Sequence, residues 1–106
     1  MDIPKNKDID SYQKISKIIS SGGVKRHTFL PSGTEIWTVV GNDGEYIQYP
    51  EREICTCPQF FFKKMHGDLG PCYHVLSVKS AKLNQSYVTI GCNDDELHIL
   101  IQLLLQ

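Results

Sequence analysis

Two closely spaced pairs of metal-ligating residues constrain this chain more than any other feature. Cys55-Thr56-Cys57 and Cys72-Tyr73-His74 place three thiols and one imidazole at i, i+2 spacing, with residues 58–71 between the pairs. Three thiolates and one imidazole suit a tetrahedral zinc ion. The spacing excludes a C₂H₂ finger, which separates its cysteines by two to four residues and its histidines by three to five. The pattern therefore predicts a metal site whose ligands are carried by other secondary-structure elements than those of a C₂H₂ finger.

The spacing also predicts the elements that carry the ligands. Side chains two residues apart share one face of a β-strand, so a strand over residues 51–57 can aim both Cys55 and Cys57 at one ion. Residues at i, i+2 in a helix are about 200° apart, which requires Cys72 to lie at the edge of a helix. Pro71 and an uninterrupted run over residues 73–83 predict that this helix begins beside Cys72. We expect strand, loop and helix, with the metal at their junction.

Other readings of the four residues are weaker. Unrelated buried thiols rarely fall into two paired clusters. Cysteines at i, i+2 are poorly placed to bridge each other, and residues 1–6 lack the apolar segment of a secretory signal. We therefore expect a reducing compartment inside the cell: the cytoplasm, the nucleoid or the nucleus. Thiol clusters in such compartments more often bind metal. The ligand set favours one structural Zn²⁺ per chain, with iron as the alternative.

The ligand motif resembles that of the SWIM family of zinc-binding domains, whose signature is C-x-C, a variable loop and C-x-H. The similarity extends to Pro58, Phe60 and Pro71, and to the aliphatic pair Val75-Leu76 on the following helix. It covers about residues 45–82, a third of the chain. The resemblance implies a ββα core in which a β-hairpin delivers Cys55 and Cys57 and a helix delivers Cys72 and His74. It makes the chain a short, stand-alone member.

Length and charge set the frame for the rest of the molecule. A chain of 106 residues is predicted to form one domain, residues 1–106, with one modest core. The net charge is −1, so the whole molecule has no strong attraction to nucleic acid. The distribution is uneven, because residues 55–83 carry four lysines and one aspartate. The predicted metal module is thus the basic part of the chain.

Periodicity outside the metal module predicts an α+β domain: a small antiparallel hairpin or meander sheet with flanking helices. Apolar residues at helical spacing predict an N-terminal helix over residues 8–21, which Gly22-Gly23 ends. Strands are predicted over residues 24–30, 35–40 and 45–49, joined by turns rich in glycine, proline, asparagine and aspartate. Pro50 is expected to interrupt pairing before the strand over residues 51–57.

A C-terminal helix over residues 94–106, capped by Asn93 or Asp94, is apolar around most of its circumference. Such a helix needs burial on several sides, and at about a dozen residues it is too short to span a bilayer. Two explanations stay open. Either the core covers most of the helix, or the helix is an interface for a partner or a second copy of the chain. The candidate interface residues are Leu97, Leu100, Ile101 and Leu104.

The segment Phe60-Phe61-Phe62-Lys63-Lys64-Met65-His66 combines aromatic and basic side chains within the expected loop between the ligand pairs. This combination can stack on bases and contact phosphates. Phe60 is expected to pack against the metal site instead, because three adjacent rings cannot all face one core. The candidate nucleic-acid-binding residues are Phe61, Phe62, Lys63, Lys64, Lys79 and Lys82.

The remaining reactive or aromatic residues are expected to be structural. We expect Trp37 in the core, His66 as a solvated loop residue and Cys92 as a buried free thiol. His27 and His98 have no cysteine near them in the sequence. Four protein ligands leave no open position for a water molecule at the metal, and the chain contains no recognised catalytic motif, so we expect no enzymatic activity.

Two functions remain. The SWIM family is associated with DNA binding and with protein contacts, and its short members resemble subunits that partner RecA-like recombinase paralogues in recombination. The resemblance therefore implies a nucleic-acid-binding accessory protein, for DNA more than RNA, in recombination or repair. The alternative is an adaptor that docks on such a partner, or on a second copy, through the C-terminal helix. No membrane role is expected.

Overall fold

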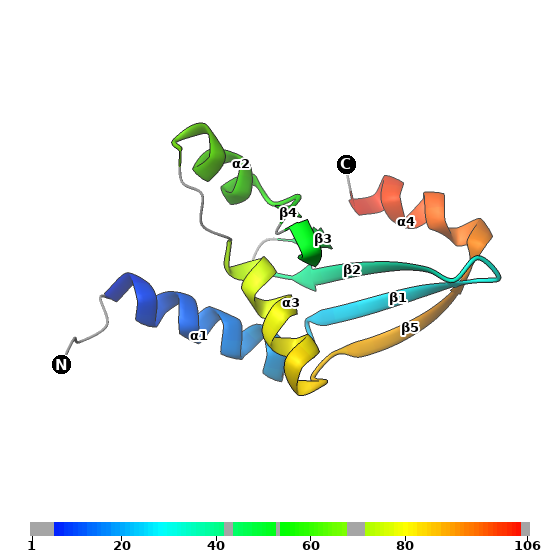
Figure 1. Ribbon diagram of the computed structural model, residues 1–106, viewed down its shortest axis with the longest axis horizontal. Coiled ribbons are helices and arrows are strands. Elements are labelled where there is room, and N and C mark those ends of the chain that lie inside the picture. The colour runs from blue at the N-terminus through cyan, green and yellow to red at the C-terminus, as the bar shows by residue number, and fades with distance from the viewer. Residues whose placement is uncertain (1–5, 42–43, 53, 68–71, 105–106) are drawn as a thin grey trace.

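A computed structural model describes residues 6–41, 44–52, 54–67 and 72–104 (Figure 1). The elements follow in the order α1 (Asn6–Ser20), β1 (Val24–Leu30), β2 (Thr34–Val40), β3 (Glu45–Tyr49), η1 (Pro50–Arg52), β4 (Ile54–Cys55), α2 (Pro58–Met65), α3 (Tyr73–Asn84), β5 (Val88–Asn93), η2 (Asp94–Glu96) and α4 (Leu97–Leu104). The predicted α+β class is confirmed: the strands form a five-stranded mixed sheet with flanking helices.

The sheet is a meander with one added parallel strand. Its order is β4-β3-β2-β1-β5, and the first four strands pair antiparallel. β5 pairs parallel with β1, for example Lys25 with Val88 and Leu30 with Asn93. The predicted antiparallel meander is thus observed over β1 to β4, whereas the parallel strand β5 was not predicted. The missed signal is the alternation of Val88, Ile90 and Cys92 with smaller or polar residues.

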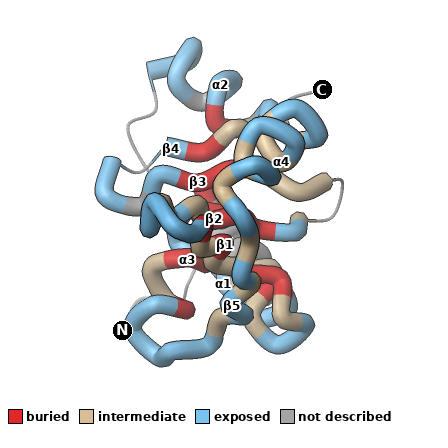
Figure 2. Tube along the Cα trace, turned by 90° about the vertical axis from the view of Figure 1, so that its right-hand side faces the viewer, coloured by how far each residue is buried: buried red, intermediate tan, exposed pale blue. Residues whose placement is uncertain are grey.

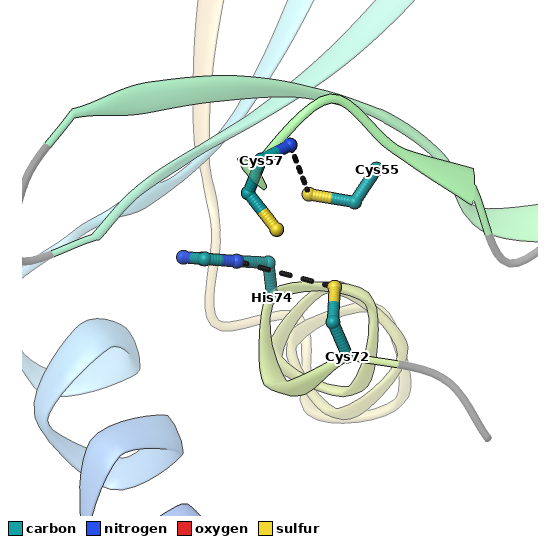
Figure 3. Close-up of side chains that lie close together, drawn as sticks. All are labelled: Cys55, Cys57, Cys72 and His74. Atoms are coloured by element: carbon teal, nitrogen blue, oxygen red, sulfur yellow. Dashed lines mark hydrogen bonds between the residues drawn. The ribbon is translucent and has the colours of Figure 1, made fainter. Parts of the chain in front are cut away.

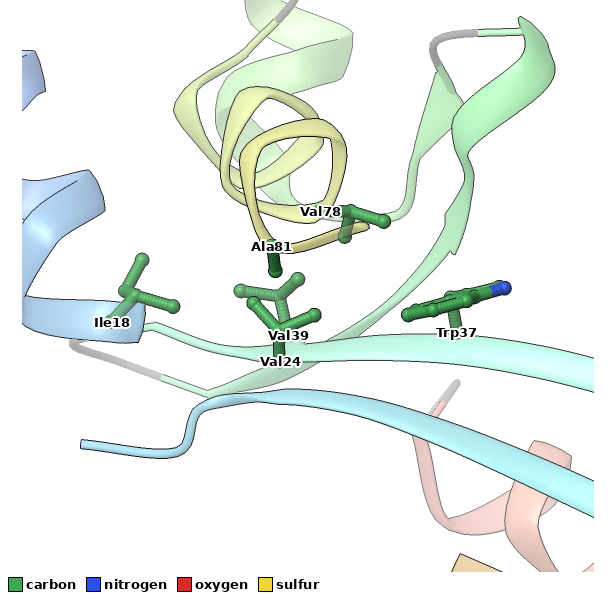
Figure 4. Packing of buried hydrophobic residues seen from close by; sticks show 6 residues of the cluster. All are labelled: Ile18, Val24, Trp37, Val39, Val78 and Ala81. Atoms are coloured by element: carbon green, nitrogen blue, oxygen red, sulfur yellow. The ribbon is translucent and has the colours of Figure 1, made fainter. Parts of the chain in front are cut away.

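Helix α3 crosses one face of the sheet, and α1 packs beside it (Figure 1). The register places Val24, Val39 and Trp37 on this face, where they form one buried cluster with Ile18, Val78 and Ala81 (Figure 4). Trp37 is 5% exposed, which confirms its prediction as a core residue. The burial of these apolar side chains is the main force that holds α1 and α3 on the sheet.

The helix ends follow local backbone rules. The Gly22 and Gly23 N–H groups donate to the Ile19 and Ile18 carbonyls, at 3.1 and 2.8 Å, and Gly22 has a φ of +74° that suits glycine. Gln85 ends α3 with a φ of 54° and donates its N–H to the Ala81 carbonyl. The predicted N-terminal helix and the helix after Cys72 are thus observed within two residues of their expected bounds.

The opposite face of the sheet carries a buried polar chain. Thr38 Oγ1 donates to Glu45 Oε2 at 2.7 Å, so the His27 Nε2–H donates to Thr38 Oγ1 at 2.9 Å. Burial lowers the pKa of His27, and Glu45 opposes this shift while Lys25 adds to it. His27 is therefore a neutral structural residue. This agrees with the prediction from the sequence, in which His27 has no cysteine nearby that could share a metal ion with it.

Helix α4 lies across the sheet from α3, as Figure 4 shows, and none of its residues is buried (Figure 2). The explanation that the core covers most of this helix was therefore wrong. A short 3₁₀ turn, η2, precedes it, and the Asn93 N–H donates to Glu96 Oε1 at 3.2 Å. No helix in the described part of the chain is both long and apolar enough to cross a membrane.

Candidate metal centre

The four predicted ligands come together at the junction of β4, α2 and α3 (Figure 3). Their ligand atoms all lie within 4.8 Å of one another, and all four side chains are buried. In Figure 3 the three sulfurs and the imidazole of His74 converge on one point. Cys72 Sγ is 3.9 Å from His74 Nδ1. This geometry makes the cluster a candidate metal centre with one ligand nitrogen and three ligand sulfurs.

The first ligand pair does not lie on one strand, contrary to prediction. β4 ends at Cys55, and Cys57 immediately precedes Pro58, the first residue of α2. The expected loop between the ligand pairs therefore contains a helix. Proline at a first helical position loses no hydrogen bond, which explains the early end of the strand. Thr56 still bonds to β3, because its N–H donates to the Ile47 carbonyl at 3.2 Å.

The second pair has the predicted placement. Cys72 is the N-cap of α3, with an extended backbone at φ −76° and ψ 164°, and its carbonyl accepts the Leu76 N–H at 3.2 Å. His74 follows in the first helical turn. The change from extended to helical backbone between the two residues is what allows both side chains to face one point despite their i, i+2 spacing. Pro71, which predicted this start, lies outside the described residues.

Amide groups surround the sulfurs. The Cys57 N–H donates to Cys55 Sγ at 3.4 Å, and the Phe60 N–H donates to Cys57 Sγ at 3.3 Å. Gln48, opposite Cys55 in the β3–β4 register, donates from Nε2 to the same Cys55 Sγ at 2.9 Å. Hydrogen-bond donors of this kind stabilise thiolates and orient metal ligands. These donors would stabilise Cys55 and Cys57 as thiolates once a metal ion is bound.

Aromatic rings and a glycine enclose the imidazole of His74. The rings of Tyr73 and Tyr46 lie with centroids 4.1 and 5.1 Å from it. His74 Nε2 is buried without a hydrogen-bond partner among the described residues, and a Cβ added to Gly41 would lie 2.5 Å from it. This packing fixes the ring with Nδ1 toward the sulfurs. No sequence signal identified Gly41, Gln48 or the two tyrosines as parts of the site.

The crowded thiols perturb one another's pKa values in opposite directions. Hydrogen bonding raises the pKa of Cys55, through Cys57 and then Cys72, and lowers the pKa of Cys72, through Cys55 and then Cys57. Burial opposes the charged form of His74, but the sulfurs of Cys57 and Cys72 outweigh it and raise its pKa to about 9. The metal-free cluster therefore stabilises negative sulfur next to positive imidazole. A divalent cation can replace that positive charge.

The donor set fits a tetrahedral metal ion. A zinc–sulfur bond of about 2.3 Å places two sulfurs of a tetrahedron about 3.8 Å apart, slightly closer than the 4.8 Å limit of the cluster. A small contraction would bring every ligand into range. The cluster contains no acidic residue, and thiolate with imidazole favours zinc or iron over magnesium or calcium.

The predicted nucleic-acid residues lie on two helices. On α2, Phe61 and Phe62 are 56% and 61% exposed, and Lys64 lies over the ring of Phe60 at 5.4 Å; the Lys63 side chain lies outside the described residues. Phe60 is buried against the metal cluster, as predicted.

The two lysines of α3 are less available than expected. Lys79 is half-buried, while Lys82 Nζ is 3.7 Å from Glu51 Oε1 and 5.2 Å from the centre of the Trp37 ring. An exposed ion pair of this kind contributes little stability, but it reduces the local positive charge. The structure thus leaves α2, rather than α3, as the more accessible aromatic and basic element.

The other candidate residues lie outside the cluster. Leu97, Leu100, Ile101 and Leu104 are half-buried on α4, whereas Ile99 and Leu103 are 48% and 65% exposed and were not among the predicted interface residues. Cys92 is half-buried rather than fully buried, and burial, with Glu96, raises its pKa. His66 is exposed, and its ring stacks on Phe62. His98 is exposed on α4.

Comparison with known proteins gives no relative: no protein-family model, no curated protein and no solved structure matches this chain. The resemblance to the SWIM family therefore rests on the motif residues alone. What the fold and the site define directly is a small α+β domain with a buried candidate metal centre of three cysteines and one histidine.

Proposed function

We propose that this chain is a zinc-stabilised binding module of the SWIM type, with no catalytic role for the metal. The observation that supports this proposal is the convergence of four buried ligand atoms within 4.8 Å. Four protein ligands complete a tetrahedral zinc ion and leave no position for a reactive water molecule. The metal then acts as a cross-link between β4, the start of α2 and the start of α3.

A zinc ion would stabilise a second buried cluster, separate from the apolar cluster around Trp37, because this second cluster consists mainly of the candidate zinc ligands. This core contains Cys55, Cys57, Cys72, Phe60 and Val75, packed beside His74. Two apolar side chains bury too little surface to order this region. Binding of structural zinc contributes on the order of 10 kcal/mol in zinc-finger peptides, so a zinc ion would supply stability that the two apolar side chains do not.

For the ordered module we propose nucleic-acid binding, with DNA as the preferred ligand, in an accessory role. The support is α2, which presents Phe61 and Phe62 to solvent with Lys64 on the same short helix. Exposed aromatic rings are available for base stacking, which contributes about 1–3 kcal/mol for one ring. With about two lysines in reach, affinity should be modest and should fall with salt at a logarithmic slope of about −2.

A protein-interaction adaptor is the second candidate, and α4 is the observation that favours it. Eight residues with no charged side chain and no buried position leave Ile99 and Leu103 exposed to water. In this alternative the helix docks on a protein partner, such as a RecA-like recombinase paralogue, or on a second copy of the chain.

Native mass spectrometry of protein purified without chelator tests the metal and the oligomeric state together. One zinc ion per chain supports the structural site, whereas a folded protein without metal removes the basis of the proposal. Fluorescence anisotropy with labelled DNA then tests the ligand. Phe62→Ala should weaken binding at least fivefold, a value consistent with loss of one stacked base. Tyr12→Ala, which removes an exposed ring from α1, is the matched control.

The two candidate functions give different results for α4. Leu103→Asp places a charge on its most exposed apolar position and should leave DNA affinity unchanged. If that variant instead abolishes dimerisation or capture of a partner, while Phe62→Ala has no effect on DNA binding, the adaptor function replaces the nucleic-acid function.

A further inference from the structure

A cavity of about 300 Å³ lies between α1, the end of β2 and the start of α3, outside the metal cluster. Lys14, Lys17 and Ile18 line it from α1, Gly41 lines it after β2, and Tyr73 lines it from α3. The three α1 residues share one side of their helix, because positions three and four apart are neighbours on a helix surface. Known ligand sites begin at about this volume, so the cavity has room for one small chemical group and its immediate surroundings.

The charge of the cavity is positive. Lys14 and Lys17 both line it, and no aspartate or glutamate does so among the described residues. Lys25, on β1, differs from them, because its Nζ is neutralised by Glu45 Oε1 at 3.6 Å. Neither lysine of the cavity has a carboxylate partner within the parts of the chain that the structure describes. An anion in the cavity therefore meets two positive charges that no carboxylate neutralises.

Tyr73 positions one of these two charges. Lys14 Nζ lies 5.1 Å from the centre of the Tyr73 ring, which attracts a cation over its face. The Tyr73 ring in turn packs against the His74 imidazole, with 4.1 Å between the ring centres. The Lys14 side chain is half-buried, whereas Lys17 is exposed. Lys14 therefore has less conformational freedom to lose when an anion binds.

The groups that line the cavity suit phosphate better than carboxylate. Each lysine ammonium offers three N–H donors, and the Gln13 side-chain amide lines the cavity as a further donor. Ser21 Oγ already donates to the Ile18 carbonyl at 3.0 Å. No arginine, whose planar fork matches a carboxylate, lines the cavity among the described residues, and lysine binds phosphate as a point charge. The donor set therefore favours an anion with several acceptor oxygens.

The cavity lies at the same end of the molecule as α2. Figure 1 shows α1 and α2 on either side of the start of α3. Phe61 and Phe62 are exposed on α2, and Lys64 lies over the Phe60 ring. Proteins that bind single-stranded nucleic acid combine such rings, on which bases stack, with cations that follow the backbone. The lysines of α1 add cations next to the aromatic helix.

We propose that this cavity binds a phosphate group between the ammonium groups of Lys14 and Lys17, and that the phosphate belongs to the backbone of a nucleic acid stacked on α2. The inference rests on the nucleic-acid function proposed above and adds a second contact to it. A free phosphate ion has the same chemistry, so the experiment has one arm for each source.

The salt dependence of DNA binding tests the backbone source, by fluorescence anisotropy with labelled single-stranded DNA. Each bound phosphate of a single strand contributes about −0.7 to the logarithmic salt slope. Lys14→Gln combined with Lys17→Gln should therefore make the slope less steep by about 0.7. Lys25→Gln combined with Lys82→Gln removes the same charge from two ion-paired lysines and should preserve the slope. Lys14→Arg combined with Lys17→Arg keeps both charges and should preserve it as well.

Titration with inorganic phosphate at constant ionic strength tests the cavity without DNA. It is followed by the amide chemical shifts of the metal-loaded chain. Saturable shifts at Ser21 and Gly41 that the double glutamine variant abolishes support the phosphate site. If these shifts appear but the DNA slope of the variant is unchanged, the ligand is free phosphate and the backbone assignment is overturned. Absence of both effects overturns the site.

Two further variants separate this inference from the proposed function. Phe62→Ala removes no charge, so it should weaken DNA binding without changing the salt slope. If Phe62→Ala weakens binding while the double glutamine variant keeps the full slope, the phosphate site alone fails. If the unchanged chain does not bind DNA, the nucleic-acid function fails and the backbone assignment fails with it. Lys17→Gln alone leaves Lys14 on the Tyr73 ring and provides the same test if the double variant does not fold.

Discussion

Gly41→Ala is the most direct test of how the metal ligands are held. Gly41 follows β2 and faces the edge of the His74 imidazole, where an added Cβ would lie 2.5 Å from Nε2 and 3.3 Å from Cδ2. Carbon and nitrogen atoms that are not bonded prefer about 3.5 Å or more. The methyl group therefore requires a movement of about 1 Å by the imidazole or by the backbone of Gly41.

The size of the effect follows from the tolerance of metal coordination. Ligand distances vary by only about 0.2 Å in good sites, so a movement of about 1 Å removes His74 from the ideal position. The rings of Tyr46 and Tyr73 leave the imidazole little room to turn. Changes just outside the ligands typically weaken metal binding tenfold to a hundredfold, or about 1.4–2.8 kcal/mol. We expect a loss within this range.

The assay is competition for zinc against a chromophoric chelator, with Gly91→Ala as the matched control. That variant adds the same methyl group in β5, where an added Cβ has no atom within 4 Å. We expect Gly91→Ala to bind zinc like the unchanged chain. Equal zinc affinity of the two alanine variants would refute the reasoning, because it would show that the imidazole of His74 does not need the space at Gly41.

Three further predictions concern the ligands, the amide behind them and a buried histidine. Gln48→Leu removes the N–H donor to Cys55 Sγ and should weaken zinc about tenfold in the same competition assay; unchanged affinity would show that this bond is dispensable. Cys57→Ser should lower both the zinc content and the melting temperature, whereas Cys92→Ser, outside the cluster, should preserve both. The lowered pKa of His27 means that the unfolded state binds a proton more readily than the folded state. The free energy of unfolding should therefore fall as pH drops below about 6.5, and His27→Gln should reduce that slope in urea titrations of the metal-free chain; an identical slope would contradict it.

The ligand set could be predicted from the sequence because it depends on local spacing. The i, i+2 spacing suited a strand at Cys55 and Cys57 and required a helix edge at Cys72, and the N-cap position of Cys72 satisfies the second requirement. The strand over residues 51–57 was predicted from the same spacing, but a turn into α2 serves Cys57 as well as a strand would. Local spacing therefore predicts which four side chains cluster better than it predicts the elements that carry them.

The surroundings of the metal centre depend on contacts between distant residues, which the sequence does not reveal. Gly41 matters because the end of β2 passes the imidazole of His74, and Gln48 matters because the β3–β4 register places it opposite Cys55. Neither residue type is unusual for a turn or a strand. The parallel pairing of β5 has the same cause, since it depends on where α3 returns the chain.

Helix α3 joins two cores of different chemistry, and this leads to a last prediction. Its first turn supplies Cys72 and His74 to the metal cluster, whereas Val78 and Ala81 pack into the apolar cluster with Trp37. The apolar cluster contains no metal ligand, so its burial persists when zinc is removed. Local stability then differs between the two ends of one helix.

Hydrogen exchange with and without chelator measures that difference. We expect chelation to increase exchange in β4, α2 and the first turn of α3, while β1, β2 and the last turns of α3 stay protected. Arg26→Ala, which removes an ion pair far from the cluster, should leave this pattern unchanged. Loss of protection throughout the sheet on chelation would contradict the division into two cores, because it would mean that the apolar cluster cannot persist without the metal. Protection unchanged everywhere would mean that packing alone orders the ligands, and that zinc has no structural role in this fold.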